Sequence, residues 1–336
     1  MFARPLQVAC AALIAAAPLT AQDDEYRWSD DRPDAMAPSS LVGTRMVPSG
    51  SVQLTYLFSN SSYSGVRLGS AVVDAGDVLS YYDSSPFQRR DRIHRAVLAF
   101  GAGESFTLLV DAHFADRSRD ITDEDFFITT EASGVGDVGV EALVSVYEGA
   151  ATRVHLIAGA EVPVGSTDER GDLLTLRDQI LPYEMQPGSG SVSVVPGIYA
   201  ETQNEFGTVG AQVKARLRLT DNDRDYRLGD QVEANGWIGY RLNDWFALTS
   251  GVRALSWGSI QGAPSDVDVG RDPGEDPVFT GGMRVDIPLG LNVHMPSGSL
   301  AGHRLSMEFA WPVHQEYDNF RVAADWGFSI GWTKAF

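Results

Sequence analysis

Residues 137–147 read DVGVEALVSVY, and apolar and polar side chains alternate along this stretch. Every even-numbered position is Val or Ala, whereas the odd-numbered positions include Asp137, Glu141 and Ser145. Successive side chains of a β-strand point to opposite faces of the sheet. The stretch therefore predicts a β-strand with one apolar face and one largely polar face.

The same alternation recurs on both sides of this stretch. In residues 208–219, Val, Ala and Leu alternate with residues that include Lys214, Arg216 and Arg218. The alternating stretches are about ten to thirteen residues long, which exceeds the usual five or six and suffices to cross a bilayer at a tilt of about 45°. Twelve candidate strands follow, at residues 51–59, 90–100, 104–115, 137–148, 151–163, 190–203, 206–219, 230–241, 244–257, 279–294, 302–313 and 321–336.

Short and long connections alternate between these candidate strands. The even-numbered connections are mostly short turns, such as residues 101–103, 149–150 and 204–205. Bacterial outer-membrane barrels have short periplasmic turns and long outer loops, and an even strand number leaves both termini in the periplasm. The odd-numbered connections are longer and polar, at residues 60–89, 116–136, 164–189, 220–229, 258–278 and 315–320.

A soluble β-sandwich or lipocalin-like barrel is the alternative, because alternation also fits a sheet with one solvent-facing side. Strand length, aromatic residues near strand ends and the loop pattern favour the membrane barrel. Backbone polar groups must be paired in lipid, so such a sheet has to close on itself. We therefore expect an all-β fold, a transmembrane antiparallel up-and-down β-barrel of about 12 strands that ends in the aromatic residue Phe336.

Aromatic residues near the strand ends fit the girdles that membrane barrels place at both interfaces. An aromatic last residue on an alternating strand is typical of chains that the barrel-insertion machinery recognises. The expected partners are therefore outer-membrane lipid and lipopolysaccharide, this insertion machinery and a small-molecule cargo. The expected girdle residues are Tyr56, Phe58, Phe100, Phe106, Trp237, Tyr240, Trp245, Phe246, Trp257 and Trp326.

The N-terminus predicts export. Residues 1–21 read as a signal peptide, with Arg4 as the positive charge, an apolar core over 8–17 and a small residue, Ala21, before the cleavage point. Residues 22–48 are then a periplasmic N-terminal segment and a possible partial plug, and residues 49–336 form the barrel. The expected location is the outer membrane of a Gram-negative bacterium.

The composition excludes several other classes. The chain has 336 residues, with 45 acidic and 26 basic side chains and a formal net charge of -19. An acidic chain without a basic block is a poor nucleic-acid binder, because phosphate neutralisation needs clustered Lys and Arg. A single Cys excludes a disulfide scaffold and a Cys-based zinc site.

The inward-facing side of the strands is rich in charges of both signs. Lys214, Arg216 and Arg218 form a basic ladder on one strand, and Gln231 and Glu233 lie on its neighbour, so ion pairing across the two strands is plausible. These charges either cross-link a plugged barrel or line a narrow passage. The candidate lumen residues are Asp111, His113, Glu141, Arg153, His155, Glu161, Lys214, Arg216, Arg218, Glu233, Arg253, Arg284, Asp286, Arg304, Glu308 and Asp325.

The sequence favours neither catalysis nor a bound metal. Asp111 and His113 share a strand face and resemble an acid–base pair, but such residues more often belong to a polar network of the lumen. Residues 221–225 resemble the start of a Ca²⁺ loop, yet Tyr226 and Val232 stand where such a loop needs Gly and Glu. We therefore expect no enzyme, no cofactor and no specific metal site, while divalent cations remain an option for the acidic outer loops.

Two motifs connect the chain with a known family. Residues 134–138 read GVGDV and residues 158–168 read AGAEVPVGSTD. They resemble the outer-membrane family described as transporters of the meta-pathway of phenol degradation, which carries a Gly-x-Gly-Asp strand start and a strand end with Pro-x-Gly. Similar short matches extend the resemblance over about residues 130–336.

The resemblance implies a passive transporter or channel for small molecules, with aromatic or hydrophobic compounds as the family-level cargo. A non-conducting barrel with a structural or partner-binding role is the alternative. Some relatives linked to copper resistance carry Met- and His-rich segments near the N-terminus, but residues 37–45 contain no His here. This difference argues against a metal role.

Overall fold

The computed structural model describes residues 26–123, 125–264 and 267–336. The predicted signal peptide, residues 1–21, lies outside the described residues. None of the helices in these ranges is long and apolar enough to span a membrane.

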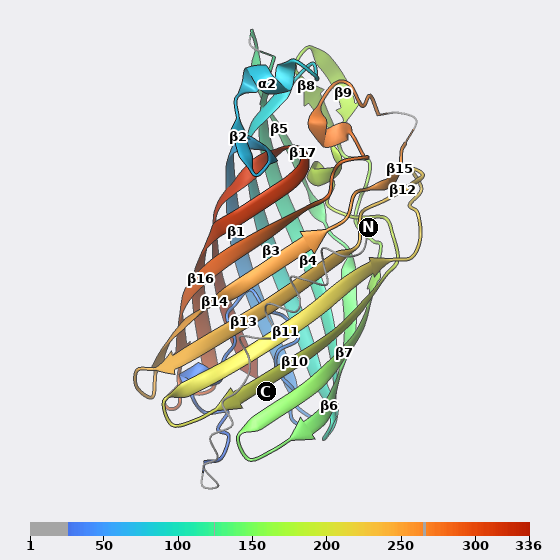
Figure 1. Cartoon of the computed structure of the whole chain (residues 1–336). Helices are drawn as coiled ribbons and strands as arrows, with labels where there is room; N and C mark the ends of the chain where they lie inside the picture. The colour runs from blue at the N-terminus through green and yellow to red at the C-terminus, as the bar shows by residue number, and fades with distance from the viewer. Residues whose placement is uncertain (1–25, 124, 265–266) are drawn as a thin grey trace.

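The described residues form a closed antiparallel β-barrel (Figure 1). Consecutive strands pair with one another around the ring, and the last strand pairs with the first. The wall consists of β1 (Val52–Gly69), β3 (Ser85–Gly103), β4 (Phe106–Thr122), β6 (Val138–Glu148), β7 (Thr152–Val162), β10 (Ser193–Gln203), β11 (Gly207–Arg218), β13 (Gln231–Arg241), β14 (Phe246–Trp257), β16 (Gly282–His294) and β17 (His303–Ala335).

The long strand β17 crosses the wall twice. Residues 304–317 pair antiparallel with β16, and residues 317–335 pair antiparallel with β1. Because β1 and β16 run in opposite directions around the alternating ring, β17 must reverse between its two halves. Eleven strand elements of the described chain therefore cross the wall twelve times, which agrees with the twelve predicted strands.

The predicted strand ranges agree closely with β6 to β16 but are too short for the first three strands. β1 continues to Gly69, β3 begins at Ser85 and β4 continues to Thr122, in stretches that the sequence assigned to loops. Outside the closed ring, β5 (Phe127–Val135) pairs with the extension of β4, and β2 (Ala71–Val73) pairs with β1. The first two long outer connections are therefore largely β-hairpins that continue the wall.

Short elements complete the connections at the same end of the barrel. The helix α2 (Ala75–Leu79) begins with a capping box between Asp74 and Asp77. The remaining elements of these connections are β8 (Arg170–Leu173), β9 (Leu176–Ile180), β12 (Tyr226–Arg227), β15 (Gln261–Gly262) and the 3₁₀ turns η2 (Tyr183–Met185) and η3 (Pro273–Glu275). The 3₁₀ turn η1 (Pro33–Ala35) lies instead near the β10–β11 turn at the other end, where the adjacent Arg32 donates to the Asn204 carbonyl oxygen.

Tight turns close the opposite end of the barrel. In the β10–β11 turn, the Asn204 side chain accepts hydrogen bonds from the backbone N–H groups of Phe206 and Gly207. Asn243 does the same for Trp245 and Phe246 in the β13–β14 turn. Such side-chain acceptors stabilise turns because they replace a backbone partner.

The alternation separates an apolar outer face from a mixed interior. Val140 is exposed on the outside of β6, whereas Glu141 and Leu143 of the same strand are buried inside.

Two aromatic residues expected in the interfacial girdles point inward instead. Trp237 is buried in the interior and Trp257 lines an internal cavity, because both occupy positions with the inward parity of their strands.

Candidate functional site

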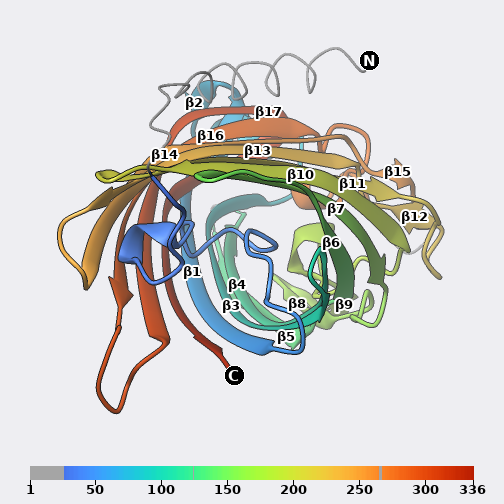
Figure 2. The ribbon, with the colours of Figure 1, turned by 90° about the horizontal axis from the view of Figure 1, so that it is seen from below.

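The N-terminal segment, residues 26–48, lies inside the barrel at the end with the tight turns (Figure 2). Its backbone bonds to inward-facing side chains of several strands. His155 Nε2 lies 2.8 Å from the Gly43 carbonyl oxygen, Gln212 donates to the Val42 carbonyl at 3.0 Å, and the Val47 N–H donates to Thr107 Oγ1 at 2.9 Å. The segment is therefore bonded to the wall along its length.

Apolar contacts support the same placement. Ala37, Leu41 and Met46 of the segment pack against a cluster inside the wall that contains Leu143, Ile157, Tyr199 and Trp237. Burying apolar surface contributes roughly 25 cal/mol per Å². This packing explains why Leu143 and Trp237 occupy inward-facing positions, although other inward-facing residues of the same strands are charged or polar.

Charged groups of the segment also have partners. Arg32 and Asp34 form an ion pair at 2.7 Å, and Thr208 donates to Asp34 at 2.9 Å. Ser40 donates to Glu308 at 3.0 Å, so this buried carboxyl of the wall is bonded to the segment. Of the predicted lumen residues, Arg153, His155, Arg304 and Glu308 thus contact the N-terminal segment.

Ion pairs cross the interior above this segment. Lys214 of β11 lies 2.6 Å from Glu141 of β6, although β7 and β10 separate the two strands in the sheet. Arg216 of the same ladder binds Glu161 of β7 at 2.6 Å. The predicted pairing with the neighbouring strand is found only for Arg216 and the neutral Gln231, at 2.6 Å. The ladder therefore finds its carboxylates across the lumen, because curvature brings β6 and β7 within reach of long side chains.

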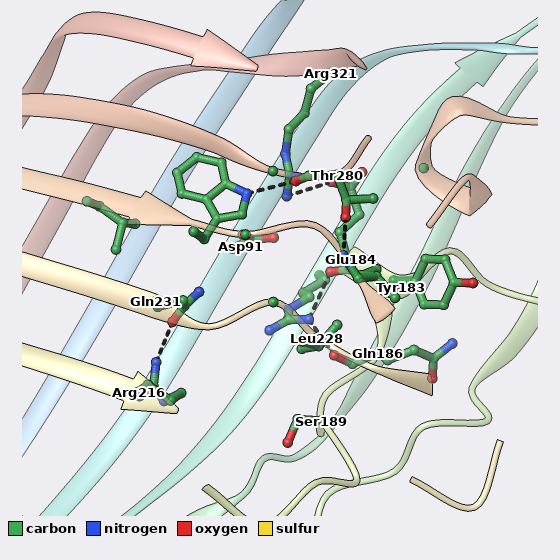
Figure 3. A pocket seen from close by; sticks show the side chains of 18 of the residues that line it. Asp91, Tyr183, Glu184, Gln186, Ser189, Arg216, Leu228, Gln231, Thr280 and Arg321 are labelled. Carbon is green, nitrogen blue, oxygen red and sulfur yellow. Dashed lines mark hydrogen bonds and ion pairs between the residues drawn. The ribbon is translucent and has the colours of Figure 1, made fainter. Parts of the chain in front are cut away.

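A cavity of about 500 Å³ occupies the barrel beneath the outer connections. Strand residues such as Arg95, Asp111 and Arg284 line its wall. Residues 183–184 and 186–189 and residues 279–281, from connections that fold inward, also line it. Figure 3 shows the hydrogen bond between Arg216 and Gln231 on one side of the cavity. Glu184, Thr280 and Arg321 lie on the other side.

Glu184 is the centre of an arginine cluster that forms part of this cavity. Its carboxylate lies 2.5 Å from Arg89, 3.1 Å from Arg119 and 3.6 Å from Arg321. Burial alone would raise the pKa of the Glu184 carboxyl, but the guanidinium groups of Arg89, Arg119 and Arg321 outweigh this effect and lower the pKa to about 2. Glu184 is therefore ionised at neutral pH and holds its connection against the wall.

A second, smaller cavity lies between the N-terminal segment and the barrel wall. Its volume is about 100 Å³, and it is lined by residues 35–39 and 41–45 together with residues of β1, β3, β4 and β17. Val42 and Arg95 line both cavities. The outer cavity, of about 500 Å³, and this inner cavity therefore lie next to each other at these two side chains.

Every predicted lumen residue except Asp325 is buried or half-buried. Asp325 is exposed, because a register shift between β1 and β17 at Tyr63 interrupts the alternation that places Ser329 inside. The sequence missed Arg89, Arg119 and Arg321, which lie in stretches assigned to loops or at a strand end. Their clustering depends on the inward fold of Glu184, for which the sequence carries no periodic signal.

Within the described ranges, no group of three or more His, Cys, Asp or Glu side chains is arranged to hold a metal ion. His113, one half of the predicted acid–base pair, lines the outer cavity together with Asp111. Asp111 is paired with Arg95 at 3.4 Å. The two residues thus belong to the charged lining of the cavity.

Comparisons with known proteins agree with this architecture. The model of the family described as "Putative MetA-pathway of phenol degradation" matches residues 37–274. Among the curated proteins, no match is found. An outer membrane channel of Pseudomonas putida F1 has 14% sequence identity and a TM-score of 0.61, with 88% of this chain and 98% of that chain covered. This likeness shows a shared fold.

Two further solved structures are less similar. The beta domain of the Bordetella autotransporter BrkA has 11% identity and a TM-score of 0.44, over 85% of this chain and 100% of that chain. The Pseudomonas putida toluene transporter TodX has 11% identity and a TM-score of 0.43, over 86% of this chain and 91% of that chain.

Proposed function

The chain belongs to the family described as "Putative MetA-pathway of phenol degradation", and from this premise we propose that it is an outer-membrane channel through which small molecules diffuse passively. The apolar outer face of the closed barrel suits a lipid environment. The similar Pseudomonas putida structure is described as an outer membrane channel, which supports the same function here. We propose no catalytic step and no cofactor.

The observation that carries this proposal is the pair of cavities along the barrel interior. The outer cavity of about 500 Å³ and the inner cavity of about 100 Å³ share Val42 and Arg95 in their linings. A displacement of these two side chains would join the cavities into one path. The outer cavity has the size of an ordinary small-ligand site, which limits the cargo to small molecules.

The N-terminal segment is proposed to act as a partial plug. It lies inside the barrel at the end with the tight turns, and its bonds to Thr107, His155 and Gln212 keep it in place. Twelve crossings enclose less space than the sixteen or more strands of open porins, so one inserted segment restricts flow strongly. Opening then requires movement of the segment around Val42.

We further propose that residues 1–21 are a cleaved signal peptide and that the barrel-insertion machinery recognises the C-terminal strand. Phe336 is exposed, and its backbone exchanges two hydrogen bonds with Val52. Phe336→Ala keeps these backbone bonds, so it should reduce the amount of protein in the outer membrane while leaving refolding of the purified chain in detergent unchanged. Quantitative immunoblots of membrane fractions measure the first effect, and an equal loss in both assays would contradict the proposal.

Conductance of the purified full-length protein in planar bilayers tests the channel function. The expected result is small, discrete openings, together with solute uptake into liposomes that contain the protein. The alternative, a non-conducting barrel, is favoured by the ion pairs that cross the lumen and by the inserted segment. An absence of openings at any voltage, combined with no uptake into liposomes, would establish this alternative instead.

A further inference from the structure

The outer cavity carries more positive than negative charge, although the chain as a whole is acidic. Nine Arg or Lys side chains line it, against six Asp or Glu side chains. The formal net charge of the chain is -19. A low-dielectric wall lined by one sign of charge concentrates ions of the opposite sign. The lining thus has an excess of positive side chains, although Asp272 and Asp286, which do not line the cavity, pair with Arg119 and Arg284.

The arginine cluster around Glu184 has more guanidinium groups than carboxylates. Arg119 has two carboxylate partners, with two hydrogen bonds to Asp272 at 2.6 and 2.9 Å and one ion-pair contact with Glu184 at 3.1 Å. Arg89 is shared between Glu184 and Asp91. The remaining members, Arg117 and Arg321, have weaker compensation.

Arg117 has no carboxylate partner among the described residues. Its Nη1 donates to the backbone carbonyl oxygens of Glu184 at 2.8 Å and Gln186 at 2.5 Å, and its buried Nε has no hydrogen-bond partner. Arg321 lies 3.6 Å from the Glu184 carboxylate and donates to the Thr280 carbonyl oxygen at 3.2 Å. A guanidinium group that is bonded only to neutral carbonyls is well suited to an added anion.

Aromatic rings lie beside these charges. The Arg321 guanidinium is 5.4 Å from the Trp257 ring centre and 6.0 Å from the Tyr317 ring centre. The Arg89 guanidinium lies 4.0 Å from the Tyr63 ring centre. All three rings belong to residues that line the cavity. The cavity thus offers apolar ring surface next to positive charge.

We propose that the outer cavity binds small organic carboxylates, with aromatic carboxylates favoured, and that Glu184 is an internal carboxylate that occupies the arginine cluster until a cargo carboxylate replaces it. This proposal rests on the proposed channel function and names its substrate class. The planar guanidinium group matches a carboxylate with two parallel hydrogen bonds. The aromatic walls accommodate the apolar part of the cargo.

Replacement of the Glu184 carboxylate by a cargo carboxylate would also affect the outer connection that carries Glu184. Glu184 belongs to η2, in the connection between β9 and β10 that covers the cavity. When a cargo carboxylate takes over Arg321 and Arg117, the contacts of these two arginines with the connection are lost, while those of Glu184 with Arg89 and Arg119 remain. A neutral analogue leaves the guanidinium groups without a counter-charge, and burial makes this arrangement unfavourable.

Equilibrium binding to the purified full-length protein in detergent tests the proposal, with radiolabelled benzoate as the probe and benzamide as its neutral competitor. Benzoate should bind at least tenfold more tightly than benzamide, since a hydrogen bond to a charged group contributes more than a neutral one. Arg117→Gln should weaken benzoate binding about tenfold, and Arg117→Lys should weaken it less. Glu184→Gln should tighten it several-fold, because it removes the internal competitor.

Arg170→Gln is the matched control, because Arg170 lies on β8 with a half-exposed side chain and does not line the cavity. It should leave benzoate binding unchanged. Heat-dependent mobility in gels verifies that each variant is folded. If Glu184→Gln fails to fold, benzoate binding by Arg117→Lys and competition by benzamide test the carboxylate site instead. Structural damage could explain weaker benzoate binding in a variant, but it could not explain tighter binding by Glu184→Gln.

The outcomes separate this proposal from the channel function. Equal binding of benzoate and benzamide, or unchanged benzoate binding in Arg117→Gln, overturns the carboxylate site even if the protein conducts in bilayers. Benzoate binding with the expected variant pattern in a protein that never conducts overturns the channel function and leaves the site established.

Discussion

Gly101 lies where the N-terminal segment passes close to the barrel wall. A Cβ atom at this position would lie 2.1 Å from the Pro48 carbonyl oxygen and 2.5 Å from that of Val47. The Gly101 carbonyl accepts from Gly50 at 2.8 Å, so the two backbones are bonded side by side. Glycine is required here because another backbone occupies the space of a side chain.

Gly101→Ala should displace residues 47–48 and destabilise the protein. We expect a loss of about 1 to 3 kcal/mol in the free energy of unfolding, as for other overpacked sites. Urea titration in detergent measures this quantity. Gly103→Ala is the matched control, since a Cβ there has no heavy atom within 4 Å. Equal effects of the two variants would show that close approach of the segment does not explain the glycine.

Glu184 makes stability depend on pH in a defined range. Its pKa is lowered from the ordinary value of 4.5 to about 2 by the surrounding arginines, despite burial. A lowered folded-state pKa stabilises the fold at pH values above the unfolded pKa, and this contribution disappears as the pH falls through the folded-state value. The shift corresponds to roughly 3 kcal/mol.

Wild type should therefore be more stable than Glu184→Gln at pH 7, and the difference should shrink by about 3 kcal/mol between pH 5 and pH 2. Denaturant unfolding of both proteins at several pH values measures this difference. The comparison with the Gln variant removes the contribution of the other carboxylates. A difference that stays constant down to pH 2 would contradict the ion pairs of Glu184.

At the scale of secondary-structure elements, β11 is tied to strands that are not its neighbours. Lys214 pairs with Glu141 on β6, and Arg216 pairs with Glu161 on β7. The side chains of Lys214 and Glu141 are only 19% and 10% exposed, so water screens their attraction weakly. These pairs stiffen the barrel across its interior.

Glu141→Gln should cost about 3 kcal/mol of unfolding free energy, because it leaves the half-buried Lys214 ammonium without a carboxylate. Adding Lys214→Met should recover part of this loss, and urea unfolding of the single and double variants measures the coupling. Asp178→Asn is the control, since it breaks the exposed Arg170–Asp178 pair and should cost less than about 1 kcal/mol. Additive effects of Glu141→Gln and Lys214→Met would rule out the cross-lumen tie.

At the scale of the whole molecule, the barrel wall and the N-terminal segment are separate structural units. The wall closes through the pairing of β1 with β17, in which residues 26–48 take no part. The segment is held by side-chain bonds and by the apolar cluster around Trp237. The wall is therefore expected to form without the segment.

Deletion of residues 30–46 should leave a folded barrel with a several-fold larger conductance in planar bilayers, because it removes the segment's part of the inner cavity lining, including Val42. Deletion of residues 297–300, in the exposed β16–β17 turn, is the control and should leave the conductance unchanged. An unchanged conductance after deletion of residues 30–46 would show that the restriction lies at the outer connections.

Much of the wall was predictable from local patterns. Residues 137–148 and 230–241 alternate clearly, and the predicted ranges agree with β6 and β13 within about one residue. The extensions of β1, β3 and β4 were missed, because polar residues on both faces of these stretches remove the alternation once the strands project beyond the apolar outer band. The inward position of Trp237 was also missed, although its parity within β13 contained that information.

The sequence by itself determined the strand count, the two faces of the wall and a part of the inward charges, because alternation is a local property of an extended chain. Only the tertiary structure decided which charges meet. Lys214 reaches Glu141 through the curvature of the sheet, and Glu184 meets Arg321 through the path of a long connection. Neither curvature nor loop path leaves a periodic pattern in the sequence, so the arginine cluster and the course of the N-terminal segment follow from the fold alone.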